Sequence, residues 1–336
     1  FLMSIHPEII KYSAHPDITF WDLKSWDFDK YDIPASELKN IQSIFQEHNI
    51  GAFMMWQDDY HYKFHSIPSK PYIVHYIWDL SLLDKNILAI VGPRKPSVYS
   101  HKVLKKLFEH AENYDLVTIS GMAGWVDQLA HALSIKHKIP TIAVLWWWLN
   151  HFLKWAERHI VQSIVDNGGL VLSEYKINFV PTKYSFPQRN RIIAGLSDMV
   201  FLPEAWESSW SLITADFANQ SSRPVYVVPN DIFSPTSFGV HQLISQQKAN
   251  ILIDFKDFFD QNFKKFGIKH TVSTKILDLP APQNDIIWLL SDNGEMSLWA
   301  IMQATGLDTD TVMQHITLLE INNHIYQNSP WKYSLY

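Results

Sequence analysis

The sequence has no cysteine, little glycine and no long apolar run. Without cysteine, a disulfide framework, a thiolate zinc site and a cysteine nucleophile are all excluded. The longest apolar run, Thr141–Leu149, is far shorter than the roughly 20 residues of a membrane-spanning helix. The first residues, Phe1–Ser4, show no basic stretch followed by an apolar one, so we expect neither a signal peptide nor a membrane span. These absences predict a cytoplasmic protein.

What is present predicts a folded chain of more than one domain. Hydrophobic residues make up 47% of the 336 residues and charged residues 18%, so enough apolar surface is available to offset the entropy of folding. The net charge of −6 argues against a generally basic nucleic-acid-binding surface. Residues 87–254 are the exception, with 15 basic and 13 acidic residues, and they contain all five arginines of the protein.

This middle segment alternates short apolar runs with stretches of helix length. The runs are Ile87–Val91, Leu116–Ser120, Thr141–Leu145, Leu170–Ser173, Met199–Leu202, Val225–Val228 and Ile251–Ile253. Such an alternation predicts an α/β fold with a doubly wound, mostly parallel sheet of the extended Rossmann type. Loops that lead from strand ends to helix starts bind phosphate in such sheets, because free N–H groups and helix dipoles converge there.

The flanks differ from the middle segment. Residues 1–86 are aromatic and acidic, with a helix expected at Ala35–His48, and predict a small N-terminal helical module. Residues 255–279 predict a connector. From residue 280 the pattern of three helices followed by two short strands is that of a winged helix. Its third helix, Thr309–Ile321, has acidic residues and no Lys or Arg, which favours a protein-contact or structural role over DNA binding.

Five motifs follow strands of the middle segment. The sequence V-G-P-R-K at 91–95 places a glycine before two cations, and S-G-M-A-G-W-V-D at 120–127 opens a helix with small residues. Asp127 and His131 are four residues apart, so an acid–base pair or half a metal site competes with plain hydrogen bonding to loops, which we favour. His61 and His65 are the nearest approach to another ligand pair, although an aromatic surface explains them better. We therefore expect no metal and no cofactor.

The third motif, F-P-Q-R-N-R-I-I-A-G-L-S at 186–197, is the most specific. Arg189, Asn190 and Arg191 at the start of a helix predict a phosphate clamp, with Lys183 just upstream, and a salt-bridged core arginine is the alternative. The fourth motif crowds hydroxyls, including Ser209 and Ser211, at a helix start. The fifth, at 228–244, repeats the strand, loop and helix pattern.

Taken in this order, the motifs resemble the DNA-processing protein A family (DprA, also called Smf). The resemblance covers residues 91–244 strongly, and Y-I-W-D-L at 76–80 looks like the family's Y-x-G-D-L. It implies a non-enzymatic, typically dimeric protein that binds single-stranded DNA on an extended Rossmann domain and loads the RecA recombinase during natural transformation or recombination. The DNA-binding residues it implies are Arg94, Ser120, Gly121, Lys183, Phe186, Arg189, Asn190, Arg191, Ser209 and Ser211. Phe186 would be an aromatic platform for a base.

The chain departs from the family pattern mainly where tryptophan replaces glycine. It has 14 Trp and 11 Gly, whereas glycine at about 7% would number roughly 24. Family glycines correspond to Trp78, Trp125, Trp210 and one or more of Trp146–Trp148. We hypothesise that UGA codons read as glycine in the source organism were translated as tryptophan, and UGG codons at these positions would contradict this. Pro93, in place of Ser or Thr, removes a hydroxyl and an N–H from the first loop.

Two other functions remain open from the sequence. Nucleoside-monophosphate phosphoribohydrolases use a glycine-rich loop at the position of the fourth motif, but the stretch Glu204–Thr214 has no acid after its threonine. A pure interaction module whose cleft has decayed is the third possibility, and tryptophans in the cleft loops would favour it.

Overall fold

A computed structural model describes residues 6–14, 31–149, 158–176, 179, 185–264, 281–293, 295–321, 325–329 and 331–335. The chain divides into two compact units, Phe1–Gly267 and Ile268–Tyr336. The sequence predicts boundaries near residues 86, 254 and 279 instead. The difference at residue 86 has a structural cause, described below.

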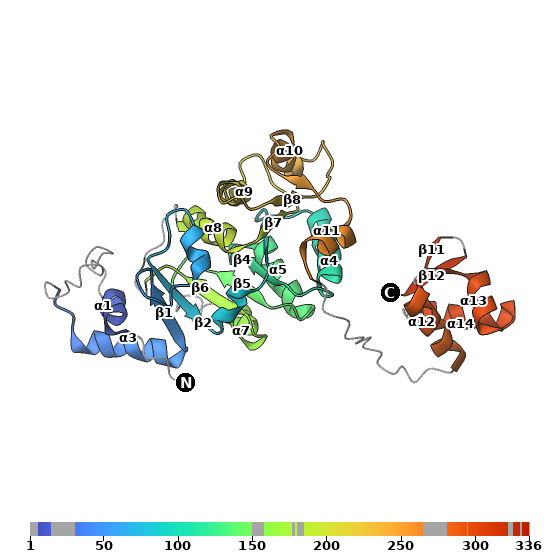
Figure 1. Cartoon of the computed structure of the whole chain (residues 1–336), viewed down its shortest axis with the longest axis horizontal. Coiled ribbons are helices and arrows are strands. Elements are labelled where there is room, and N and C mark those ends of the chain that lie inside the picture. The colour runs from blue at the N-terminus through green and yellow to red at the C-terminus, as the bar shows by residue number, and fades with distance from the viewer. Residues whose placement is uncertain are drawn as a thin grey trace. The chain divides into compact units, whose positions relative to one another are not determined.

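The first unit is built on a nine-stranded sheet in the order β1-β2-β6-β5-β4-β3-β7-β8-β9 (Figure 1). All seven strands expected in residues 87–254 are present, and β3 to β9 run parallel to their neighbours within this group. The α/β class with a Rossmann-like sheet is thus confirmed. The strands are β1 (Ile50–Met54), β2 (Ile73–Ile77), β3 (Ile87–Ile90), β4 (Val117–Ser120), β5 (Thr141–Val144), β6 (Leu170–Ser173), β7 (Met199–Leu202), β8 (Val225–Val227) and β9 (Asn250–Ile251).

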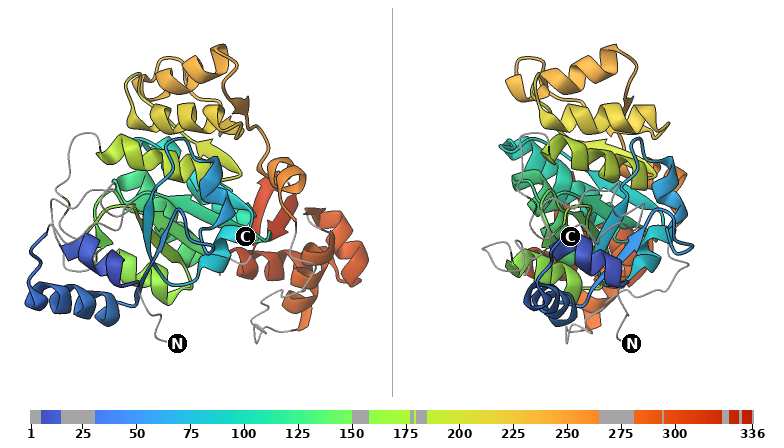
Figure 2. Two further views of the ribbon diagram at one scale, coloured as in Figure 1. Left: turned by 60° about the vertical axis from the view of Figure 1, so that its left-hand side comes forward. Right: turned by 90° about the vertical axis from the view of Figure 1, so that its left-hand side faces the viewer.

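Helices cover both faces of this sheet (Figure 2). On one face α4 (Val98–Ala111) contacts α5 (Trp125–Lys136) and α11 (Phe255–Asn262), and α5 contacts α7 (Arg158–Asp166). On the other face α8 (Ser185–Leu196) packs against α9 (Trp210–Gln220). The short α10 (Phe238–Ser245) follows the 3₁₀ turn η3 (Pro235–Ser237). Apolar side chains of the central strands are buried on both faces, as expected for a sheet covered twice.

The N-terminal region is part of this sheet and not a separate helical module. Helices α1 (Pro7–Ala14) and α3 (Ala35–Glu47) pack on the antiparallel pair β1 and β2, and β2 pairs with β6, with His75 opposite Ser173. The sequence prediction missed both strands, because prolines at 68 and 71 suggested broken structure where a fully buried strand begins. The 3₁₀ turns η1 (Tyr62–Ser66) and η2 (Leu80–Asp84) connect these strands to each other and to β3.

The second unit has its own apolar core. Helices α12 (Ala281–Asn293), α13 (Leu298–Thr305) and α14 (Thr309–Ile321) surround buried Ile286, Ile301, Ile316 and Tyr333. Strands β10 (Met296–Ser297), β12 (Lys332–Leu335) and β11 (Ile325–Ser329) form a small antiparallel sheet in that order. The three helices and last two strands lie where the sequence predicts them.

Within the described ranges, no helix is both long enough and apolar enough to cross a lipid bilayer.

Candidate functional site

A narrow cleft lies at the carboxyl edge of the parallel strands. It encloses about 40 Å³ and is formed by the loops after β3 and β4 and by the first turns of α8 and α9. Its lining residues, here called the cleft, are Val91, Gly92, Arg94, Ala123, Asp127, Phe186, Arg189, Asn190, Ile193, Trp210, Ser211 and Thr214. Five of the ten predicted DNA-binding residues are therefore brought together here. They come from three separate motifs of the sequence.

Two guanidinium groups flank an aromatic ring in the cleft. The Cζ atom of Arg94 lies 4.5 Å from the centroid of the Phe186 ring, and that of Arg189 lies 5.6 Å away. The indole of Trp146 stacks on Phe186, with centroids 4.4 Å apart. Arg94 is exposed, whereas Arg189 is only 1% exposed. The arrangement offers an exposed cation, a buried cation, and an aromatic ring within 6 Å of both.

Arg189 is a buried cation held by neutral groups. Its Nη1 donates to the carbonyl of Val144 and its Nε donates to Oδ1 of Asn190 at 3.2 Å. Burial lowers the pKa of Arg189 to about 10, opposed by the charge of Asp127, so the group stays charged at neutral pH. Burial likewise raises the pKa of Asp127, against the effect of Arg189. Among the described residues, no carboxylate lies within ion-pair distance of Arg189.

The position of the Arg189 guanidinium requires glycine at residue 121. A Cβ atom at Gly121 would lie 2.3 Å from Nη1 and 2.4 Å from Nη2 of Arg189. Any side chain there would displace the guanidinium, because real contacts are never so short. Ser120, the preceding residue, is buried and donates its hydroxyl to the carbonyl of Ile90 at 2.6 Å. Both residues thus support the cleft from behind and do not line it.

Arg191 points away from the cleft, unlike its neighbours in the motif. Its Nη2 and Nη1 lie 2.6 and 3.0 Å from the two carboxylate oxygens of Glu174, and its Nε donates to the carbonyl of Ser69 at 2.9 Å. Its side chain is buried with that of Glu174. This is the salt-bridged core arginine that the sequence left as the alternative. A phosphate contact by Arg191 would require the pair with Glu174 to break.

The start of α9 supplies hydroxyls, as the fourth motif predicts. Ser209 caps the helix by accepting from the N–H of Ser211 at 3.3 Å, and the two hydroxyl oxygens are 2.6 Å apart. Ser211 lines the cleft and Ser209 lies one step behind it. Asn190 joins α8 to this point through a 3.5 Å contact with the carbonyl of Trp210. Lys183 lies outside the described residues.

His131 and Asp127 form no acid–base pair in this structure. The Nε2 of His131 lies 2.9 Å from the carbonyl of Gly121, which fixes a proton on Nε2, and Nδ1 lies 2.9 Å from the Thr141 hydroxyl. Thr141 accepts in turn from Thr118 at 2.8 Å. Burial lowers the pKa of His131 to about 4, so the ring is neutral. Asp127 instead accepts from the N–H of Ala123 at 3.2 Å.

The sequence analysis gave no role to Glu204, which ties three loops together. Its carboxylate accepts from the N–H of Ser97 at 3.0 Å, from the hydroxyl of Ser100 at 2.7 Å and from that of Thr236 at 3.1 Å, and also from the Ser97 hydroxyl. The loops after β3, β7 and β8 are thereby held together beside the cleft. The hydroxyl residues at 97, 100 and 236 were the available clue, but their common partner lies over 30 residues from each.

No cluster of three or more metal-ligating side chains occurs in the part of the chain that the structure describes. His61 lies 3.1 Å from a carboxylate oxygen of Asp84, and His65 packs edge-on against Tyr60. The pair therefore does not converge on a common point.

The backbone supports the glycine hypothesis at one of the suspect tryptophans. Trp78 has φ +84°, a conformation that costs an L side chain roughly 1–2 kcal/mol and costs glycine nothing. Trp331, which the sequence analysis did not single out, has φ +64° in the turn between β11 and β12. Trp210 and Trp146 act differently, since the first lines the cleft and the second covers Phe186. With glycine at both positions the cleft would be wider and one face of Phe186 would be open.

Comparisons with known proteins agree with the resemblance in the sequence. The family described as DNA recombination-mediator protein A matches residues 52–262. DNA processing protein DprA of Bacillus subtilis is 32% identical over 226 residues, covering 67% of this chain and 75% of the relative. Its counterpart in Streptococcus pneumoniae is 36% identical over 206 residues, covering 61% and 72%.

Two solved structures are also similar. The X-ray structure of DprA from S. pneumoniae has a TM-score of 0.59 and 30% identity, and covers 76% of this chain and 92% of that one. DNA processing protein A from Helicobacter pylori, whose structure concerns its single-stranded DNA binding mode, has a TM-score of 0.57 and 27% identity, covering 63% and 94%. Residues 52–262, which the family model matches, include the whole cleft.

Proposed function

The chain belongs to the DNA recombination-mediator protein A family of DNA-processing proteins, and we propose that its cleft binds single-stranded DNA without catalysing a reaction on it. Single strands are bound by cations that follow the backbone and by aromatic faces on which bases stack. The cleft supplies both kinds of group within one contact, the Arg94 guanidinium over the Phe186 ring. This contact is the observation that carries the proposal.

The roles of the site residues differ on this proposal. Arg94 meets a phosphate at the cleft mouth, while Ser211 and Asn190 donate to phosphate oxygens from the starts of α9 and α8. Arg189 adds positive potential from the cleft wall. Ser120, Gly121 and Ser209 hold these groups in place, Lys183 adds a cation upstream of α8, and Arg191 anchors α8 through Glu174.

We further propose that the bound strand is handed to the RecA recombinase by a dimer of this chain. The S. pneumoniae and H. pylori relatives are DNA-processing proteins, and the matching family is named for recombination mediation. RecA filament formation on oligothymidine is expected to be faster when the protein is present. No acceleration at saturating protein would contradict the loading role and leave strand binding intact.

Binding is tested by fluorescence titration of a labelled oligothymidine and of its duplex at two salt concentrations. Two proteins are compared: the chain as printed, and a variant with Trp→Gly at 78, 125, 146, 147, 148 and 210, called here the glycine variant. We expect the glycine variant to bind the single strand more tightly than the duplex, with affinity that falls as salt rises. If neither protein binds the single strand at low salt, the proposal is wrong.

The alternative hydrolase function is less well supported. A cavity of about 40 Å³ is smaller than the ≈ 300–1,000 Å³ of a typical small-molecule site. The carboxylate of Glu204 already accepts hydrogen bonds from three residues. Release of ribose 5-phosphate from a nucleoside monophosphate by the glycine variant would restore that alternative.

A further inference from the structure

Four aromatic side chains stand exposed in the segments that follow β3, β7 and β8. Phe233 is 87% exposed, and Phe238, Trp206 and Tyr99 are between 37% and 51% exposed. Tyr99 lies in the first turn of α4 and Phe238 begins α10, while Trp206 and Phe233 lie in the loops after β7 and β8. The strands that precede these segments, β3, β7 and β8, are neighbours in the sheet. We call these four residues the aromatic rim. None of them lines the cleft itself.

The loop that carries Phe233 has hydrogen bonds within itself and to neighbouring segments. Ser237 donates its hydroxyl to the carbonyl of Ser234 at 2.6 Å, and Ala205 donates its N–H to the carbonyl of Thr236 at 2.9 Å. The phenol of Tyr99 donates to the carbonyl of Pro229. A large apolar side chain thus stands in water on a hydrogen-bonded loop, and a partner that covered it would gain the free energy of its burial.

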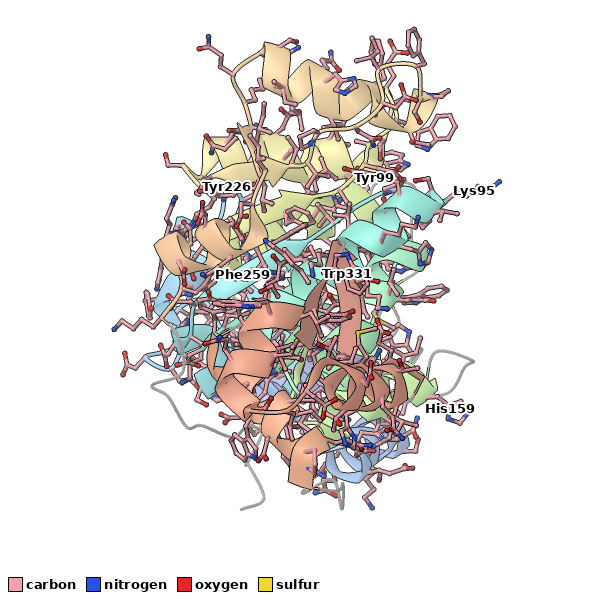
Figure 3. The ribbon with its side chains drawn as sticks, turned by 90° about the vertical axis from the view of Figure 1, so that its right-hand side faces the viewer. Lys95, Tyr99, His159, Tyr226, Phe259 and Trp331 are labelled. Atoms are coloured by element: carbon pink, nitrogen blue, oxygen red, sulfur yellow. The ribbon has the colours of Figure 1, made fainter. Side chains whose placement is uncertain are left out.

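The rim continues the cleft in two places. Arg94 at the cleft mouth is followed by the exposed cation Lys95, and Figure 3 shows Lys95 and Tyr99 together near the start of α4. On the other side, the N–H of Ser209 donates to the carbonyl of Trp206 at 3.1 Å. Tyr99 and Trp206 thus lie within five residues of the cleft-lining residues Arg94 and Trp210.

We infer that the aromatic rim stacks the bases of single-stranded DNA that extend beyond the segment held in the cleft. This rests on the proposed function. Bases are the occupant that fits, because stacking on aromatic faces requires unpaired bases and tolerates any sequence. The neighbouring carboxylates of Glu207 and Asp231, both exposed, repel phosphates, so the rim is expected to act through stacking and not through charge.

The test compares strand lengths in the glycine variant of the full chain. Affinities are measured for oligothymidines of about 5 and about 20 nucleotides, spanning the range of site sizes for single-strand binders. The rim variant combines Phe233→Ala with Phe238→Ala, since neither residue is a tryptophan and the codon question does not affect them. Tyr62→Ala is the matched control. Tyr62 is an aromatic residue with a 63% exposed side chain on η1, and no residue of η1 lines the cleft.

We expect the rim variant to bind the long strand about tenfold more weakly and the short strand as before. The control should bind both strands as the parent does. Unchanged affinity for the long strand overturns the inference and would fit a protein partner for the rim. An equal loss on both lengths also overturns it, because the rim would then belong to the cleft.

The outcomes separate this inference from the proposed function. Arg94→Ala should weaken both lengths if the cleft binds DNA. If the parent binds neither strand, both the proposed function and the rim inference fail. If the glycine variant binds DNA and the rim variant binds the long strand equally tightly, the inference fails and the proposed function stands.

Discussion

The cleft and the polar layer directly behind it use the same kinds of residues with opposite results. Behind the cleft, His131, Thr141 and Thr118 satisfy one another, and Arg191 meets both oxygens of Glu174. In the cleft, Arg94 is exposed and Arg189 has no carboxylate partner within ion-pair distance in the described chain. Polar groups already paired inside the protein stabilise the fold, whereas an exposed cation such as Arg94 remains available to an anion.

Helix α8 shows this difference within three residues. Arg189 and Arg191 are separated by one residue and are both buried, yet they face opposite sides of the helix. Only the first lines the cleft. The motif therefore contains one arginine in the cleft wall and one paired with a buried carboxylate.

Loss of the structural arginine should have the largest effect on stability. Arg191→Ala leaves the Glu174 carboxylate buried without its partner, and we expect a loss of about 3–5 kcal/mol in unfolding free energy, measured by urea denaturation. Gln188→Ala, at an exposed position of the same helix, is the control and should change little. A variant of normal stability that loses DNA affinity would break the comparison, because Arg191 would then serve the ligand.

Two buried histidines should also make the free energy of unfolding depend on pH. Burial lowers the pKa of His131 and of His75 to about 4 from the usual 6.5, so on acidification the unfolded chain takes up these protons first. Stability should then fall between pH 6.5 and 4 by about 1.4 kcal/mol per pH unit for each histidine, and this contribution should level off below pH 4.

Urea unfolding at several pH values measures this slope. His131→Gln should remove the His131 share of the slope and retain that of His75. A slope unchanged by the substitution would mean that His131 is not held neutral in the native state.

Removal of the cation at the cleft mouth should change binding and not stability. Arg94→Ala should weaken single-strand binding about tenfold and reduce the slope of log affinity against log salt by about one. Lys105→Ala, at an exposed position of α4, should leave both quantities near the parent values. A marked loss of unfolding free energy in the Arg94 variant would place that residue in the structural group.

The smallest effect concerns a tryptophan outside the cleft. Trp78→Gly should stabilise the chain by about 1 kcal/mol, because it relieves a left-handed backbone at an exposed side chain. The same change at Trp288, within helix α12, should destabilise it by about 1 kcal/mol or more. Thermal unfolding distinguishes the two signs. Destabilisation by Trp78→Gly would contradict the view that the backbone conformation at this position favours glycine over tryptophan.

The seven strands of the Rossmann-like sheet could be predicted because each is a short buried run followed by a turn and a helix pattern. Strands β1 and β2 were missed because prolines at 68 and 71 suggested broken structure, although the two strands pair with each other. The place of β2 in the sheet depends on β6, nearly 100 residues later. The motifs predicted residues of the cleft, but they did not predict which arginine lines the cleft and which pairs with Glu174. Whether Arg191 contacts a phosphate or Glu174 depends on the packing of residue 174, directly after β6, near α8. No local sequence pattern predicts that packing.

The order of strands in the sheet has a consequence for how the chain acquires its structure. The β1–β2 pair is made early in synthesis, but its place in the sheet exists only after Ser173 is available to pair opposite His75. Strand β3 likewise waits for β7, with Leu88 opposite Met199. Pairings so distant in sequence form slowly. We therefore expect the β1–β2 pair to lack its neighbour in the sheet on the ribosome until β6 has been synthesised.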